Sequence, residues 1–211
     1  MAAVAALYDI HGNLAALDAV LAEVPDDATI LVGGDICAGG EQPSETLARL
    51  RGLGDRVAWL RGNADRELHP DEDGLAPADF LAKARSQLSG EEIEFLHELP
   101  PTQRIGDVLY CHASPRNDLD IFTERTPGER IAFLFAGLDA ATVVCGHSHT
   151  QFDRTVAGVR VVNAGSVGMP YEDEPGAYWL LDLVHRRTPY EGAELTASRE
   201  EAVAEFTERG L

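Results

Sequence analysis

Short apolar segments that each run into an Asp, Asn or His at a turn recur through residues 2–149 of this chain. The five junctions are Asp9-Ile10-His11-Gly12-Asn13, Gly34-Asp35, Gly62-Asn63, Cys111-His112 and Gly146-His147-Ser148-His149. In an open α/β sheet, ligands bind beyond the carboxyl ends of the strands. The pattern therefore predicts a fold that gathers these side chains into one shared site at the edge of its sheets.

The segments between these junctions alternate between strand and helix patterns. Residues 2–8, 29–33 and 56–60 are apolar and predict buried strands. Apolar residues at helical spacing predict a helix over 14–24, and Ser44 is expected to cap a second helix. This βαβαβ order predicts parallel strands joined by right-handed crossovers. A polar connection over 62–76 then leads into helical segments, one of which begins at the Ser89/Glu92 capping box.

The second half of the chain is richer in strand patterns. Strands are predicted over 107–111, 142–145, 151–156, 159–163 and 177–183, with a hairpin turn at Ala157-Gly158. Helices are predicted over 127–136 and behind a capping box formed by Ser198 and Glu201. We expect one domain over residues 1–211, built from two stacked sheets with helices outside.

The balance of charge limits the partners that the chain can bind. It carries 36 acidic and 17 basic side chains, a formal net charge of −19. Binding of a nucleic-acid duplex rests on Lys and Arg meeting phosphates, so this balance argues against it. An anionic small substrate remains compatible with the charge, because bound metal ions reverse the local potential.

The lengths of the apolar runs and the number of cysteines indicate the cellular compartment and whether the chain meets a membrane. No apolar run reaches the roughly 18 residues typical of a membrane-spanning helix. Residues 1–8 lack a basic leading region and are interpreted as a strand rather than a signal peptide. The three cysteines form no CxxC motif, which argues against a disulfide framework. We therefore expect a cytoplasmic protein without a membrane partner, and the sequence leaves the oligomeric state open.

The side chains at the five junctions are typical metal ligands. They comprise two Asp, one Asn and four His. Mixed nitrogen and oxygen donors without thiolates suit Mn, Fe, Zn, Co or Ni rather than a cysteine-type zinc site. A single Asp at the end of a strand is more often a turn or a helix cap. It is the ordered set of five junctions, each after a predicted strand, that favours a metal site.

These motifs, D-x-H, G-D, G-N, a single H and G-H-x-H, resemble those of the calcineurin-like metallophosphoesterase superfamily. Residues 163–168 (NAGSVG) resemble the N-P-G-S segment of that family, with Ala164 in place of the proline. The opening over 9–13 and the segment over 62–66 (GNADR) are most similar to small phosphodiesterases of the YfcE type. The resemblance covers residues 3 to about 183.

The resemblance implies a four-layer αββα sandwich and two divalent metal ions, with Mn²⁺ favoured and Fe, Zn, Ni or Co as alternatives. One ion would be held by Asp9, His11 and His149, the other by Asn63, His112 and His147, and Asp35 would bridge them. A hydroxide bridging two such ions would attack phosphorus in line with the leaving oxygen. Asn63 and His112 would also contact the phosphoryl oxygens. The implied activity is hydrolysis of a small phosphoester, in the first place a phosphodiester.

Two departures from the family pattern bear on the substrate. Many members carry a His directly after the motif Asn, where it can protonate the leaving group, and this chain has Ala64 there. Phosphoprotein phosphatases also place an Asp three residues after the motif aspartate to orient that His, and this chain has Ala38. The paired loss disfavours phosphoprotein phosphatase activity and favours leaving groups that depart without strong protonation.

Several alternatives remain open at this point. The chain could be a phosphoprotein or nucleotide phosphatase of the same superfamily, or a catalytically silent scaffold, although scaffolds lose ligands and all seven are intact here. Arg66 and Arg116 follow the motif residues closely and are expected either to bind substrate phosphate or to form surface ion pairs. The acidic run over 172–174 is interpreted as a solvated loop.

Overall fold

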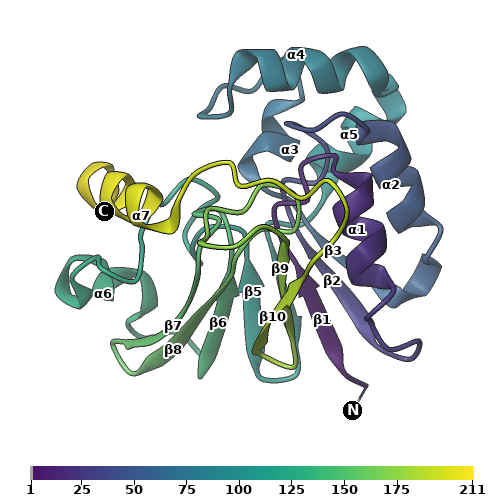
Figure 1. The fold of residues 1–211 in the computed structure, drawn as a ribbon. Helices are drawn as coiled ribbons and strands as arrows, with labels where there is room; N and C mark the ends of the chain where they lie inside the picture. Colours follow the sequence, from purple (N-terminus) through teal and green to yellow (C-terminus); the bar gives the residue numbers. More distant parts are fainter. Residues whose placement is uncertain (1) are drawn as a thin grey trace.

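The computed structural model, which describes residues 2–211, contains two five-stranded mixed sheets packed face to face with helices on their outer sides (Figure 1). The first sheet has the order β10(Val184–Thr188), β9(Ala177–Leu181), β1(Val4–Leu7), β2(Thr29–Gly33), β3(Val57–Leu60). The second has the order β4(Thr102–Ile105), β5(Val108–Cys111), β6(Thr142–Cys145), β8(Val159–Ala164), β7(Gln151–Val156). The predicted αββα sandwich is confirmed.

Parallel pairing brings the ends of the central strands to one edge of the molecule. Strands β1, β2 and β3 are parallel, and so are β5, β6 and β8. Leu7 pairs with Val32 and Gly33 with Leu60, so the loops that follow these three strands lie side by side. The loops after β5 and β6 leave the second sheet in the same way. We call this edge of the sandwich the carboxyl edge.

Successive side chains along a strand point to opposite faces of its sheet. The apolar interior therefore has three layers, one between each sheet and its helices and one between the two sheets. In β1, Ala5 and Leu7 pack under the helices, whereas Ala6 packs between the sheets. Helices α1(Leu14–Leu21), α2(Pro43–Arg51), α4(Ala78–Gln87) and α5(Gly90–Glu98) cover the first sheet. Helix α6(Gly128–Phe135) covers the second sheet through Ile131 and Phe135. None of the helices formed by residues 2–211 is long and apolar enough to cross a bilayer.

The predicted elements were largely found, and the differences have local causes. Helix α3(Asn63–Glu67) lies within the expected polar connection, and edge strands β4 and β10 were not predicted. The strand expected over 177–183 ends at Leu181, because Asp182 and Leu183 take positive φ and turn the chain into β10. The hairpin at Ala157-Gly158 formed as expected, with positive φ at both residues.

Of three predicted helix caps, those at Ser89 and Ser198 are found and that at Ser44 is wrong. Ser198 accepts the N–H of Glu201 at 3.4 Å and donates its hydroxyl to the Glu201 carboxylate at 2.7 Å, and the helix begins at Arg199. Ser89 accepts the N–H of Glu92, whose carboxylate accepts the N–H of Ser89 in return, so this capping box is confirmed. Ser44 does not cap α2. A proline at the first helical position starts the helix one residue earlier, and Ser44 donates its hydroxyl to the Gln87 carbonyl at 2.6 Å instead.

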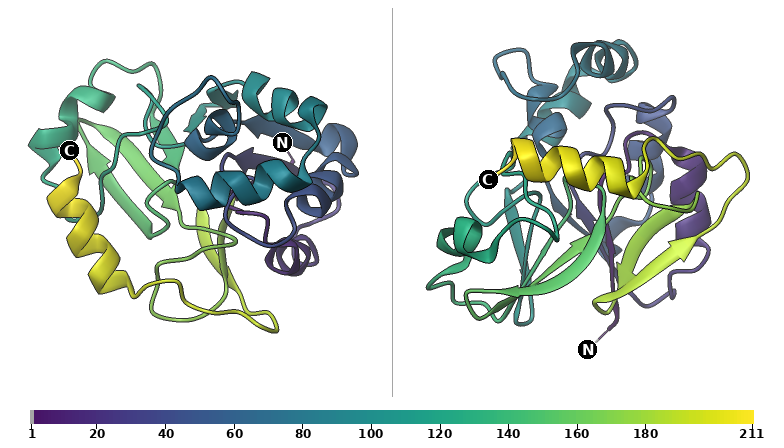
Figure 2. Two further views of the ribbon diagram at one scale, coloured as in Figure 1. Left: turned by 90° about the horizontal axis from the view of Figure 1, so that it is seen from above. Right: turned by 60° about the vertical axis from the view of Figure 1, so that its left-hand side comes forward.

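The interpretation of residues 172–174 as a solvated loop was wrong for Glu172. Asp173 and Glu174 are exposed, but Glu172 is buried and accepts the N–H of Gln151 and the guanidinium of Arg199, each at 2.6 Å. Arg199 opens helix α7(Arg199–Arg209), which is thereby fixed to the sandwich. Seen from above, α7 and α4 lie on opposite sides of the carboxyl edge (Figure 2).

Candidate metal centre

Seven side chains from both sheets converge at the carboxyl edge. Asp9, His11 and His149 form one cluster, and Asp35, His112 and His147 form a second, in each of which the potential ligand atoms lie within 4.8 Å of one another. Asn63, which is 4% exposed, lines the same pocket as His11, Asp35 and His147. The structure therefore brings the seven predicted ligands together at one edge. The cluster of Asp9, His11 and His149 is the predicted group, whereas Asp35 clusters with His112 and His147 only, so its bridging role and the grouping of Asn63 stay predictions.

Most of these residues have an unusual backbone conformation. Positive φ occurs at Asp9 (53°), His11 (50°), Asp35 (53°), His147 (65°) and His149 (55°). Residues with a side chain rarely adopt this left-handed region, and each such residue costs on the order of 1–3 kcal/mol. Such conformations persist where the surrounding structure imposes them, and they cluster at functional sites.

Backbone carbonyls fix the orientation of three imidazoles. The Nδ1 atom of His11 lies 2.5 Å from the Ala38 carbonyl oxygen, that of His149 2.7 Å from the Met169 oxygen, and that of His112 2.9 Å from the Gly33 oxygen. Because a carbonyl oxygen only accepts hydrogen bonds, each Nδ1 carries the proton and donates. Each Nε2 then faces the other ligands, which is the usual arrangement of metal-binding histidines.

The inward-facing atoms lack the hydrogen bonds that buried polar atoms normally have. The Nε2 atoms of His11 and His149 lie 3.1 Å apart, and a neutral imidazole that donates through Nδ1 has only a lone pair at Nε2. Burial lowers the pKa of His11, which favours its neutral form. Among residues 2–211, Asp9 Oδ1, Asn63 Oδ1 and His147 Nε2 are buried without a hydrogen-bond partner. Lone pairs that converge in this way fit divalent cations.

The carboxylates give the site a strong negative potential. Burial lowers the pKa of His112, but the charges of Asp35 and Asp9 outweigh it and raise that pKa to about 10. Burial and the neighbouring His112 lower the pKa of His147 to about 4. Burial opposes ionisation of Asp35, yet the contact with His112 holds the pKa of this carboxyl well below its usual range. A site that attracts a proton this strongly is suited to bind a cation.

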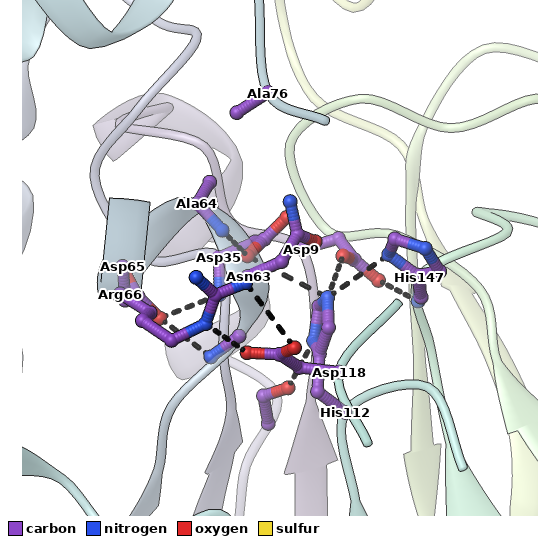
Figure 3. Close-up of polar contacts among 12 residues, drawn as sticks. Asp9, Asp35, Asn63, Ala64, Asp65, Arg66, Ala76, His112, Asp118 and His147 are labelled. Carbon is purple, nitrogen blue, oxygen red and sulfur yellow. Dashed lines mark hydrogen bonds and ion pairs between the residues drawn. The ribbon is translucent and has the colours of Figure 1, made fainter. Parts of the chain in front are cut away.

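Asp65, which sequence analysis left without a role, supports the loop of Asp35. Its fully buried carboxylate accepts the backbone N–H of Asp35 at 2.7 Å (Figure 3). It also accepts the backbone N–H groups of Ile36 and Gly62, each at 2.9 Å. Burial and the charge of Asp35 raise the pKa of Asp65 to about 7, although the three N–H groups favour its ionised form. Asp65 thus joins the loops that carry two of the proposed ligands.

Glu67 is a second supporting carboxylate that sequence analysis missed. It is buried and accepts the Asn63 amide at 3.1 Å, so the amide nitrogen faces Glu67 and Oδ1 is left for the site. The same carboxylate accepts the backbone N–H groups of Leu75 at 3.1 Å and Ala76 at 2.7 Å. It therefore fixes both a proposed ligand and the segment above it. The only sequence signal was the proximity of Asp65 and Glu67 to Asn63.

Glycines and the 163–168 segment let the ligand loops pack closely. A Cβ at Gly62 would lie 2.1 Å from Asp35 Oδ1, so no other residue fits there without a shift. Ser166 donates to the Asp9 carbonyl at 2.7 Å, and the Asn163 amide donates to the Gly146 carbonyl at 2.7 Å. The segment that resembles the N-P-G-S motif therefore connects the loops that follow β1 and β6.

Replacement of Asp65 by Asn should weaken metal binding without removing a ligand. An amide oxygen can accept two of the three backbone N–H groups at best, and its NH₂ group would face a donor. Loss of groups that support ligands typically costs about 10–100-fold in metal affinity. Metal affinity measured by calorimetry checks this, with exposed Asp173→Asn as the matched control. An unchanged affinity in the Asp65 variant would mean that the loops hold their position without it.

Arg66 and Arg116 lie outside the pocket that holds the proposed ligands. Both line a neighbouring pocket, and both guanidinium groups contact carboxylates. Arg66 donates to Asp118 at 2.8 Å (Figure 3), and Arg116 donates to Asp120 at 3.0 Å. Substrate binding by these two residues stays a prediction, and ion pairing describes their observed contacts.

Replacement of Arg116 by Ala distinguishes substrate binding from ion pairing as the role of this residue. The Arg116 side chain is half exposed, so the substitution should change the melting temperature little. If the guanidinium binds substrate phosphate, KM rises several-fold while kcat is kept. An unchanged KM assigns Arg116 to ion pairing alone.

The two alanines that replace the acid pair both line the pocket of the candidate metal centre. Ala38 and Ala64 are buried there, next to Asp35 and Asn63. Apart from the proposed ligands, the only titratable side chain among the described residues that line this pocket is Tyr171. Its ring stacks on His149 with 4.7 Å between centroids and an interplanar angle of 26°. No imidazole stands in for the missing acid.

The two-sheet sandwich with paired His/Asp clusters at its carboxyl edge is an arrangement that can be compared with known proteins. Residues 3–186 match the family model of the calcineurin-like phosphoesterase superfamily domain, and the chain belongs to this superfamily. The resemblance indicated by the sequence motifs is thus confirmed.

Similar proteins include both sequences and solved structures. An uncharacterised protein from Methanocaldococcus jannaschii is 27% identical over 191 residues, 84% of this chain and 73% of that protein. The crystal structure of a metallophosphoesterase from Sphaerobacter thermophilus is similar with a TM-score of 0.73 and 24% identity, over 90% of this chain and 89% of the other. YfcE, a phosphoesterase from E. coli, is similar with a TM-score of 0.51 and 20% identity, over 85% and 87% of the two chains. These structural likenesses establish the shared fold.

Proposed function

We propose that this protein is a dinuclear metal phosphodiesterase that hydrolyses a small phosphodiester, with Mn²⁺ as the favoured ion. The observation that carries the proposal is the pair of facing clusters, with buried ligand atoms that have no hydrogen-bond partner. Asp9, His11 and His149 would hold one ion, and Asn63, His112 and His147 the other. Asp35 would be shared by both.

The side chains of the protein would hold the ions and orient the substrate, and they would supply little acid–base chemistry. When bound, two divalent ions would stabilise charge on the phosphoryl oxygens and would lower the pKa of a bound water to about 7. Asn63, which lines the pocket, and His112, which is buried beneath its lining, would also contact phosphoryl oxygens. Asp65 and Glu67 hold the loops and the Asn63 amide in place. With a metal-activated water as the attacking group, the protein need not supply a covalent nucleophile.

The lining of the pocket favours a diester over a phosphoprotein. Ala38 and Ala64 provide no proton for a serine alkoxide, which is a poor leaving group. A phosphoprotein phosphatase therefore fits this site less well. A silent scaffold also fits less well, because scaffolds lose ligands and here all seven are present together.

Reconstitution of metal-free protein tests the proposal. The protein is stripped of metal and incubated with Mn²⁺, Fe²⁺, Co²⁺, Ni²⁺ or Zn²⁺ in turn, and hydrolysis of diesters and monoesters is measured. We expect diester hydrolysis that depends on metal and two ions per chain by metal analysis. Fewer than one ion per chain under saturating Mn²⁺ would overturn the dinuclear site, and faster cleavage of monoesters would favour a phosphatase.

A further inference from the structure

We infer that the apolar side of this pocket binds an uncharged aromatic ester group of the substrate, while the phosphate lies at the proposed ligands. This inference rests on the proposed function and specifies its substrate class. The pocket has a volume of about 200 Å³. An apolar cavity of about 150 Å³ holds a benzene ring. Because the proposed ligands line the same pocket, the space beside the phosphate suits part of one aromatic ring and no larger group.

Three separate segments build the apolar wall. Leu75 comes from the segment that leads into α4 and Phe80 from the first turn of α4 itself. Met169 and Tyr171 come from the loop after β8, and Phe206 from α7. Helices α4 and α7 lie on opposite sides of the carboxyl edge (Figure 2), so the pocket lies between two walls. Ala38 and Ala64, which replace the acid pair, leave further apolar surface beside the ligands.

Charge argues against a second anionic group in this space. No Lys or Arg belongs to the described residues that line the pocket. The nearby Arg66 donates to Asp118 and Glu72, and lines a different pocket. The chain as a whole carries a net charge of −19. A second phosphate or carboxylate would therefore lose hydration without gaining a cation, which disfavours polyphosphates.

Packing fixes the aromatic wall relative to the proposed ligands. Tyr171 stacks on His149, and its ring centroid lies 5.8 Å from that of Phe206. The Glu172–Arg199 ion pair, directly after Tyr171, holds the start of α7. A ring bound here would meet a preformed surface, so little binding free energy would be lost in ordering the pocket.

Phosphonates that share one head group measure this preference by calorimetry on the Mn²⁺-loaded protein. The probes are methylphosphonate, benzylphosphonate and (4-carboxybenzyl)phosphonate. Burial of about half a phenyl ring should make benzylphosphonate bind about tenfold more tightly than methylphosphonate. The carboxylate should remove most of that gain. Phe206→Ala and Phe80→Ala, on opposite walls, should each reduce severalfold the ratio of benzylphosphonate to methylphosphonate affinity.

Phe133→Ala is the matched control, because Phe133 is 55% exposed on α6 and does not line the pocket. It should leave both affinities unchanged. Equal binding of methylphosphonate and benzylphosphonate would overturn the inference and leave the metal centre intact. Tighter binding of the carboxylated probe would overturn the preference for an uncharged group. Failure of all three phosphonates to bind would instead contradict the proposed function, and with it the inference.

Discussion

Replacement of Asp35 by Asn should reduce turnover by more than about 100-fold, because loss of groups that merely support ligands already costs about 10–100-fold. Asp35 is the proposed shared ligand, and its carboxylate also accepts the N–H of Ala64 at 2.8 Å. An amide keeps the size of the side chain but removes the charge that would serve both ions. Metal analysis after reconstitution and diester hydrolysis on the same samples check this expectation.

Asp153→Asn is the control for this substitution. Asp153 pairs with Arg160 on the exposed side of β7, so the same chemical change falls outside the site. Its metal content and turnover should match those of the unmodified protein. If the Asp35 variant keeps two ions and most of its activity, the bridging role is misassigned.

The rate should depend steeply on the pKa of the leaving group. General acid catalysis is typically worth about 10²–10⁴-fold in rate, and the pocket offers no imidazole in the place of Ala64. The missing donor costs little when a nitrophenolate departs and most when a serine alkoxide departs. Activated aryl diesters should therefore be cleaved well and phosphoserine peptides poorly.

A series of aryl diesters of graded leaving-group pKa measures this slope. A flat dependence, with chemistry shown to limit the rate, would mean that another group donates the proton. Ala64→His alone should restore little activity toward poor leaving groups, because Ala38 cannot orient the new ring. The double variant Ala38→Asp with Ala64→His should flatten the slope, since both positions line the same pocket.

Much of the fold could be predicted because strands and their final residues carry strong local signals. The apolar runs that end at Asp9, Asp35 and Asn63 identified parallel strands, and parallel strands necessarily share a carboxyl edge. Edge strands β4 and β10 were missed, because polar residues along an edge weaken the apolar pattern. Ser44 was misassigned because a proline beside it sets the helix start more strongly than a hydroxyl.

Less of the supporting structure of the site could be predicted. The carboxylates of Asp65 and Glu172 are buried by contacts with backbone N–H groups from other segments, and a sequence pattern gives no sign of such partners. An acidic residue is usually solvated, so the base rate favoured the wrong interpretation of Glu172. The left-handed φ at Asp9 and His11 is likewise imposed by the folded structure rather than by residue type.

Each of the two clusters draws ligands from both sheets, and this has a consequence for assembly of the protein. His11 follows a strand of the first sheet and His149 a strand of the second, and 138 residues separate them. Bringing residues together across such a sequence separation closes a long loop, which has an entropic cost and slows folding. Neither of the two proposed ions could acquire its full set of ligands until the sheets have docked. An ion bound there would oppose their separation by binding the folded chain alone, so metal affinity would report how tightly the two halves of the sandwich are joined.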